Sequence, residues 1–137
     1  MPESDTQSDA DAKRFILLVE DDEFLRSLVV RKLEEAGYGV AVAKDGEEAL
    51  RLAGETVPDL LLLDLVLPGF SGFELVAKLR QNDATAKIPF IVLSNSSETQ
   101  SKKQSQDLGA AGYLVKAQST PADIVATIGR FFASRPR

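Results

Sequence analysis

The chain has 137 residues, a formal net charge of −5, and neither cysteine nor histidine. The length suits one domain and excludes two. The sequence has no signal peptide, and no apolar stretch approaches the roughly 20 residues of a membrane span. We therefore expect a cytoplasmic protein without a membrane partner. Disulfides, thiolate chemistry and imidazole ligands are excluded, so any metal is held by oxygen, and the acidic balance argues against direct contact with nucleic acid.

The first 12 residues are polar and acidic without periodic apolar positions, and we expect a disordered acidic leader there. One domain should then cover residues 13–133, and residues 134–137 should form a tail or the start of a linker. Within the domain, five short apolar runs predict β-strands. These runs cover residues 15–19, 39–43, 60–63, 90–93 and 112–115.

Helical patterns lie between and after these strands. The first has an apolar stripe over residues 25–36 and should end at Gly37. Capping residues mark the starts of three others, namely Asp45 with Glu48, Ser71 with Glu74, and Thr120 followed by Pro121. The candidate helix over residues 97–108 differs because it has almost no apolar residue before Leu108. Little burial would hold it, so we expect it to be the mobile element.

Strands without polar alternation, each followed by a helix, predict a parallel sheet covered on both faces. Right-handed crossovers leave few topologies for such a chain. We expect an α/β fold of the flavodoxin-like (βα)5 type, a doubly wound five-stranded parallel sheet of order 2-1-3-4-5. Ligands of such sheets bind at the carboxyl ends of the strands, so the functional site should lie there.

The residues that follow the strands carry the chemistry. Glu20, Asp21 and Asp22 come after the first strand, one of them expected to be a helix N-cap, and Asp64 comes after the third. Ser94 and Lys116 follow the fourth and fifth strands. A lone Ser or Lys at such a place is ordinarily a loop residue. The combination of an acid pair, an acid, a hydroxyl and an ammonium at four strand ends is what predicts a site.

Glu20 and Asp21 beside Asp64 would repel one another unless a cation relieved them. A Mg²⁺ ion is the expected relief, because it prefers one or two carboxylates and keeps several waters. We expect Asp21 and Asp64 as direct ligands, Glu20 as a ligand through water, and the backbone carbonyl of Val66 as the last protein ligand. With Lys116, the formal charges of this group then sum to zero.

A site of this kind can receive a phosphoryl group. Asp64 would act as the nucleophile and give an aspartyl phosphate, with Mg²⁺ and Lys116 neutralising the transferred oxygens. The hydroxyl of Ser94 could then donate a hydrogen bond to a phosphoryl oxygen.

Four segments, residues 18–22, 58–72, 88–94 and 108–116, together resemble the response-regulator receiver domain of two-component signal transduction. The resemblance covers roughly residues 14–133. It implies that Asp64 is the phosphoacceptor, Glu20 and Asp21 the acidic pocket, Ser94 the switch hydroxyl, Lys116 the phosphate-contacting lysine, and Tyr113 an aromatic switch that turns inward on activation.

The resemblance also implies partners. A histidine kinase or phosphotransfer protein would supply the phosphoryl group, and a downstream protein would read the switched state. The domain would catalyse only its own phosphorylation and dephosphorylation. It would be a stand-alone receiver or part of a longer regulator, and a monomer or a phosphorylation-dependent dimer.

Three residues depart from the family pattern. Ala117 stands where receivers usually carry a proline, joined to the lysine by a cis peptide bond. A cis bond before a non-proline residue costs about 3–4 kcal/mol, so the bond before Ala117 is either trans or strained. Either state affects the placement of Lys116. Ser94 replaces the common threonine, which frees its χ1 angle and would weaken two-state coupling. Asn95 replaces a smaller residue and would narrow access to Asp64.

The resulting hypothesis is a phosphorylation switch. The acylphosphate on Asp64 would draw Ser94 toward it, Tyr113 would follow, and the face of the fourth helix, fifth strand and fifth helix would change shape.

Three alternatives remain beside this hypothesis. A phosphatase with an aspartate nucleophile would need an acid where Val66 stands. A flavin-binding electron carrier shares the fold, but the acidic run at residues 20–22 would repel its phosphate. A pseudo-receiver that acts only as a phosphorylation-independent interaction module should have a broken acid set, whereas this set is intact.

Overall fold

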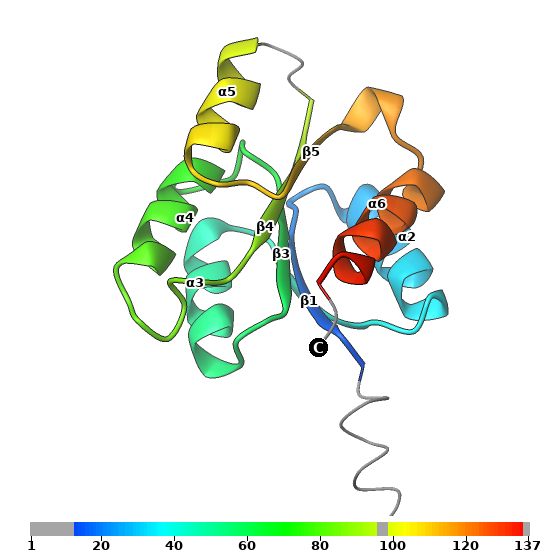
Figure 1. Ribbon diagram of the computed structural model, residues 1–137, viewed down its shortest axis with the longest axis horizontal. Coiled ribbons are helices and arrows are strands. Elements are labelled where there is room, and N and C mark those ends of the chain that lie inside the picture. Colours follow the sequence, from blue (N-terminus) through cyan, green and yellow to red (C-terminus); the bar gives the residue numbers. More distant parts are fainter. Residues whose placement is uncertain (1–12, 96–98, 136–137) are drawn as a thin grey trace, which may run out of the picture.

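A parallel five-stranded sheet forms the centre of the computed structural model, which describes residues 13–95 and 99–135 (Figure 1). Its strands are β1 (Phe15–Val19), β2 (Gly39–Ala43), β3 (Leu60–Leu63), β4 (Phe90–Ser94) and β5 (Gly112–Val115). They are ordered β2-β1-β3-β4-β5 and every neighbouring pair is parallel. This confirms the predicted fold, with the fourth strand one residue longer than expected because it includes Ser94.

Helices cover both faces of the sheet. They are α2 (Glu23–Glu35), α3 (Gly46–Glu55), α4 (Gly72–Arg80), α5 (Thr99–Asp107) and α6 (Pro121–Ala133). In Figure 1, α3, α4 and α5 lie on one side of the sheet and α2 and α6 on the other. A short 3-10 helix, η1 (Lys116–Gln118), was not predicted. The expected leader at residues 1–12 and the start of the fourth helix at residues 97 and 98 lie outside the described residues.

Alternate residues of the central strands point to opposite faces and form two separate cores. The core under α3, α4 and α5 contains Leu17, Val19, Leu61, Leu63, Phe90 and Val92. The core under α2 and α6 contains Ile16, Leu18, Leu60, Leu62, Ile91 and Leu93. This alternation decides toward which face a side chain just beyond each strand will point.

Three of the expected helix caps form as predicted. Asp22 accepts a hydrogen bond from the Leu25 amide at the start of α2, and reciprocal capping boxes start α4 at Ser71 and α6 at Thr120. The box expected between Asp45 and Glu48 is only half present. Asp45 caps α3 by accepting from the Glu48 amide, but the Glu48 carboxylate accepts from the Lys44 amide, one residue before the cap.

Helix α5 packs with little apolar burial. Its only buried residue is Ser105, whose hydroxyl donates to the Ser101 carbonyl within the same helix at 2.9 Å. Because apolar burial supplies most of the stability of a short helix in a protein, α5 is held more weakly than its neighbours. Of the helices in the described part of the chain, none is long and apolar enough to cross a membrane.

Candidate functional site

Glu20 and Asp64 stand one residue beyond the two central strands, β1 and β3. The sheet continues through their backbones, since the Glu20 amide donates to the Ala43 carbonyl and the Asp64 amide donates to the Val19 carbonyl, both at 3.0 Å. Because side chains alternate along a strand, both side chains point to the face of the sheet that α2 and α6 cover. Only 1% of Glu20 and 6% of Asp64 is exposed. The strand ends therefore hold two carboxylates side by side, in a fixed direction and almost out of water.

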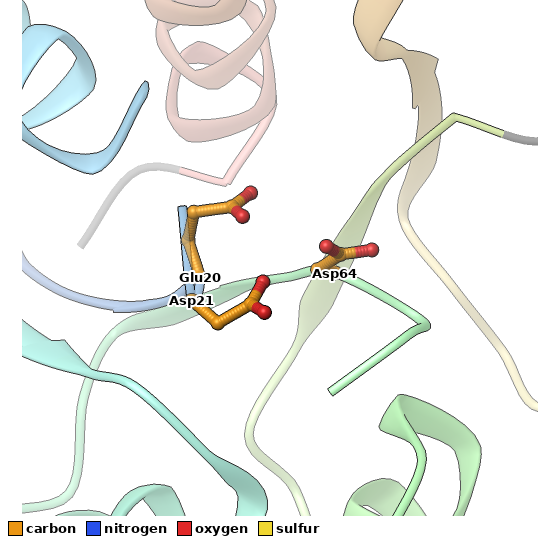
Figure 2. A group of neighbouring side chains, drawn as sticks. All are labelled: Glu20, Asp21 and Asp64. Atoms are coloured by element: carbon orange, nitrogen blue, oxygen red, sulfur yellow. The ribbon is translucent and has the colours of Figure 1, made fainter. Parts of the chain in front are cut away.

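Asp21 completes a group of three carboxylates, drawn in Figure 2. Glu20, Asp21 and Asp64 each offer an oxygen that lies within 4.8 Å of the other two, and Asp21 is exposed. The prediction that these three acids meet is confirmed. All donors in the group are oxygens, the ligands that hard cations prefer.

Lys116 reaches into this group from the end of β5. Its ammonium donates to Asp64 Oδ2 at 2.7 Å and lies 2.7 Å from Glu20 Oε1. No peptide bond within the described ranges is cis, so the bond to Ala117 is trans. The lysine therefore contacts Asp64 with a trans bond to Ala117, one of the two states expected there, and the 3-10 helix η1 begins at Lys116.

The remaining carboxylate oxygens are only partly satisfied. The Asp22 amide donates to Glu20 Oε2 at 3.0 Å, and the Val66 amide donates to Asp64 Oδ1 at 3.1 Å. Glu20 Oε1 is buried, and its partner among the described residues is the Lys116 ammonium 2.7 Å away. Three carboxylates beside one ammonium leave this group with net negative charge, which a bound cation would relieve. The donor set therefore fits a hard divalent ion.

The pKa values of the paired residues reflect their burial. Burial raises the pKa of Glu20 above its ordinary value, and the Lys116 ammonium and the Asp22 amide offset only part of that rise. Burial acts to lower the pKa of Lys116, but Asp64 and Glu20 outweigh it, so this pKa is raised. Lys116 therefore keeps its positive charge at neutral pH, and a nearby cation would favour the charged form of Glu20.

Ser94 and Tyr113 lie toward the other face of the sheet. In the pairing of β4 with β5, Val92 lies opposite Tyr113 and Ser94 opposite Val115. Ser94 and Tyr113 thus share a face and lie diagonally across two neighbouring strands. Tyr113 is half-buried against the core under α3, α4 and α5, and the Lys102 ammonium lies 6.0 Å from its ring.

The site opens into a cavity of about 390 Å³. It is lined by Glu20, Asp21, Asp22, Asp64, Val66, Ser94, Asn95 and Lys116. Val66 is 77% exposed and Asn95 is exposed, so both stand at the rim. Another cavity, of about 370 Å³, lies by Arg14 and Phe132, near residues that precede the strands, and contains none of the three clustered acids. The cavity at Asp64 is therefore the candidate functional site, because the three clustered acids and Lys116 line it.

Sequence reasoning missed two residues beside the site. Arg26 of α2 donates to the backbone carbonyls of Glu20 and Asp21. Gly72, at the start of α4, donates its amide to the Leu65 carbonyl at 2.9 Å and lies against the Asp64 backbone. An arginine one turn into the helix after the acidic run was a weak signal for the first. The second had no signal beyond the capping pattern at Ser71.

Comparison with known families shows to which family the chain belongs. Residues 16–129 match the family described as "Response regulator receiver domain". The chain belongs to this family. Receiver domains of response regulators are switch domains rather than enzymes in the ordinary sense, and they act with histidine kinases and downstream effectors.

Curated relatives of this receiver domain include transcriptional regulators. It is 40% identical over 115 residues to the "DNA-binding dual master transcriptional regulator RpaA" of Synechocystis, covering 84% of this chain and 46% of that protein. It is 37% identical to the phosphate regulon regulator PhoB of Pseudomonas aeruginosa, covering 82% of this chain and 49% of that protein. The chain therefore spans about half the length of these relatives.

Solved structures show the same fold. The chemotaxis protein CheY4 of Vibrio cholerae matches with a TM-score of 0.80 and 32% identity, covering 87% of this chain and 98% of that one. The non-phosphorylated HemR receiver domain of Leptospira biflexa matches with a TM-score of 0.81 and 32% identity, covering 91% and 99%.

Proposed function

We propose that this receiver domain is a phosphorylation-dependent switch whose phosphoacceptor is Asp64. The observation that carries the proposal is the placement of that carboxylate. It is nearly buried at the end of a central strand, opens into a cavity, and contacts Lys116 at 2.7 Å beside two further acids. A histidine kinase or a phosphotransfer protein is the proposed donor, and a downstream protein is the proposed reader.

Asp21 and Asp64 would hold Mg²⁺ directly, with Glu20 acting through water and the Val66 carbonyl as a further ligand. The three clustered carboxylates support this assignment, because the single ammonium of Lys116 leaves their group with net negative charge. When bound, the ion supplies charge neutralisation for the transferred phosphoryl oxygens.

The protein residues divide the remaining work. A carboxylate oxygen of Asp64 attacks the phosphorus in line with the leaving group, and the strand end keeps that oxygen oriented. Lys116 exchanges its contact with the Asp64 carboxylate for one with a phosphoryl oxygen, which stabilises the negative charge on that oxygen. The Ser94 hydroxyl donates to another phosphoryl oxygen.

Movement of Ser94 would reach the surface through Tyr113. The two share a face of β4 and β5, so space that Ser94 leaves is open to the tyrosine ring. The face of α5, β5 and α6 would then change shape, and the weakly anchored α5 makes that change inexpensive. The domain would contact a protein here, as a monomer or as a dimer formed on phosphorylation. Direct contact with nucleic acid is not expected of this domain.

Magnesium binding separates a switch from a pseudo-receiver that serves only as an interaction module. We expect calorimetric titration to show one Mg²⁺ site, with the affinity reduced by about tenfold or more in Asp21→Asn and in Asp64→Asn, because each variant removes a charged ligand. Asp83→Asn, which removes an exposed acid remote from the cavity, is the matched control and should bind as the wild type does. Failure of the wild-type protein to bind Mg²⁺ would favour the interaction module.

Amide hydrogen exchange tests the switch itself. Addition of fluoroberyllate with Mg²⁺, as a phosphoryl mimic on Asp64, should change protection across residues 94–116, since Ser94, α5 and Tyr113 lie in that range. Ser94→Ala should bind the mimic but show a smaller change. Unchanged protection of residues 94–116 in the wild type would contradict the proposed coupling.

A further inference from the structure

Arg26 makes an unusual contact beside the acid cluster. Its Nη1 donates to the Glu20 carbonyl at 3.0 Å and to the Asp21 carbonyl at 3.5 Å. The residue lies in the second turn of α2, where its own amide donates to the Asp22 carbonyl at 2.9 Å. One rigid guanidinium therefore joins the helix to two successive peptide groups of the loop that carries the acid pair.

The end of the β1 and β2 pairing explains why this donor is needed. The last sheet bond here runs from the Glu20 amide to the Ala43 carbonyl. The chain then leaves the sheet. The Lys44 amide donates to the Glu48 carboxylate, and Asp45 caps α3. Strand β2 thus supplies no amide for the Glu20 carbonyl. Arg26 satisfies it in place of a strand neighbour, as a carbonyl at a sheet edge requires.

Holding these carbonyls fixes the directions of the two acidic side chains. The Glu20 carboxylate must reach Lys116. The carboxylates of Glu20 and Asp21 must also lie beside that of Asp64 (Figure 2). Rotation of the peptide between Glu20 and Asp21 would move both side chains. Nothing else in the described structure bonds to the Glu20 carbonyl, so Arg26 is the group that opposes this rotation.

We infer that Arg26 is a positioning residue for the cation site, and this inference rests on the proposed Mg²⁺ site. It acts through the backbone of Glu20 and Asp21 and touches neither the ion nor the phosphoryl group. Its positive charge also lies beside the loop that carries two of the three clustered acids. The hydrogen bonds and the positive charge of Arg26 both lower the free-energy cost of keeping three carboxylates together. Residues that hydrogen-bond to metal ligands commonly govern metal affinity in this way.

The test compares Arg26→Gln with Arg31→Gln in the otherwise intact protein. Both variants remove one arginine charge from α2, but Arg31 is exposed and, unlike Arg26, has no hydrogen bond to residues 20–22 among those of the described structure. We expect Mg²⁺ affinity, measured by calorimetry, to fall about tenfold in Arg26→Gln and to stay near the wild-type value in Arg31→Gln. Arg26→Lys keeps the charge but loses the planar guanidinium whose Nη1 contacts both carbonyls, and we expect an intermediate affinity.

A second readout separates positioning from catalysis and from general destabilisation. The rate of phosphorylation by a small phosphodonor should be slow in Arg26→Gln at low Mg²⁺ and return to the wild-type maximum at saturating Mg²⁺. Equal affinities in Arg26→Gln and Arg31→Gln would overturn the inference, and so would a maximum rate that saturating Mg²⁺ does not restore. If Arg26→Gln does not fold, a wild-type affinity in Arg26→Lys would overturn the inference that the Arg26 guanidinium positions the acid loop. A wild-type protein without Mg²⁺ binding would instead overturn the proposed function and this inference with it.

Discussion

Replacing Lys116 with methionine should lower the free energy of unfolding by about 2–4 kcal/mol in buffer without divalent cations. The Lys116 side chain is only 13% exposed, and it lies 2.7 Å from both Glu20 and Asp64. Its loss leaves two buried carboxylates facing each other without a cation. Breaking a buried pair by removing one partner is costly for that reason.

Magnesium should recover part of this loss. The ion would replace the missing positive charge, so Lys116→Met should gain more stability from Mg²⁺ than the wild type gains. Urea unfolding with and without Mg²⁺ measures both effects. Lys103→Met removes an exposed lysine and should change the stability by less than about 0.5 kcal/mol. Equal losses in the two variants would contradict the account of the buried ion pair.

The same variant should also slow phosphorylation by about a hundredfold, because Lys116 is the proposed donor to a developing phosphoryl charge. This rate is measured at saturating Mg²⁺, where the metal site is filled. An unchanged rate would show that Lys116 is only structural.

Replacing Gly72 with alanine is the second change with a large expected effect. A β-carbon at Gly72 would lie 2.6 Å from the Asp64 carbonyl oxygen and 3.0 Å from the Leu65 Cα. Backbone atoms cannot rotate away as a side chain can, so the loop after β3 must shift. We expect a loss of roughly 1–3 kcal/mol in the free energy of unfolding.

Because the displaced backbone belongs to Asp64, the phosphorylation rate should fall as well, by roughly tenfold or more. Gly54→Ala is the matched control, since a β-carbon there meets nothing within 4 Å and Gly54 lies within α3. That variant should gain roughly 0.5–1 kcal/mol and keep its phosphorylation rate. A Gly72→Ala protein as stable and as reactive as the wild type would show that the loop yields freely.

The fold could be predicted because its signals are local. Each strand is a short apolar run, and caps such as Ser71 and Thr120 mark helix starts without reference to the rest of the chain. Parallel strands then place their following residues at one edge of the sheet. That single geometric fact is enough to predict that Glu20, Asp21, Asp64 and Lys116 lie together, as they do in the structure.

Other features depend on contacts that no local pattern encodes. The side chain of Glu48 bonds to Lys44 rather than to the cap at Asp45, a choice between neighbours that the capping pattern leaves open. The role of Arg26 exists only because β2 ends before it can serve the Glu20 carbonyl. The short helix η1 after β5 is formed by three ordinary residues without a sequence signature.

The phosphoacceptor is tested most directly by intact mass spectrometry after exposure to a small phosphodonor with Mg²⁺. The wild-type protein should gain the mass of one phosphoryl group, and the label should be lost under conditions that hydrolyse acylphosphates. Asp64→Asn should gain none, because its amide lacks the nucleophilic carboxylate. Equal labelling of Asp64→Asn, or no labelling of the wild type while it binds Mg²⁺, would contradict the assignment of Asp64 as the phosphoacceptor.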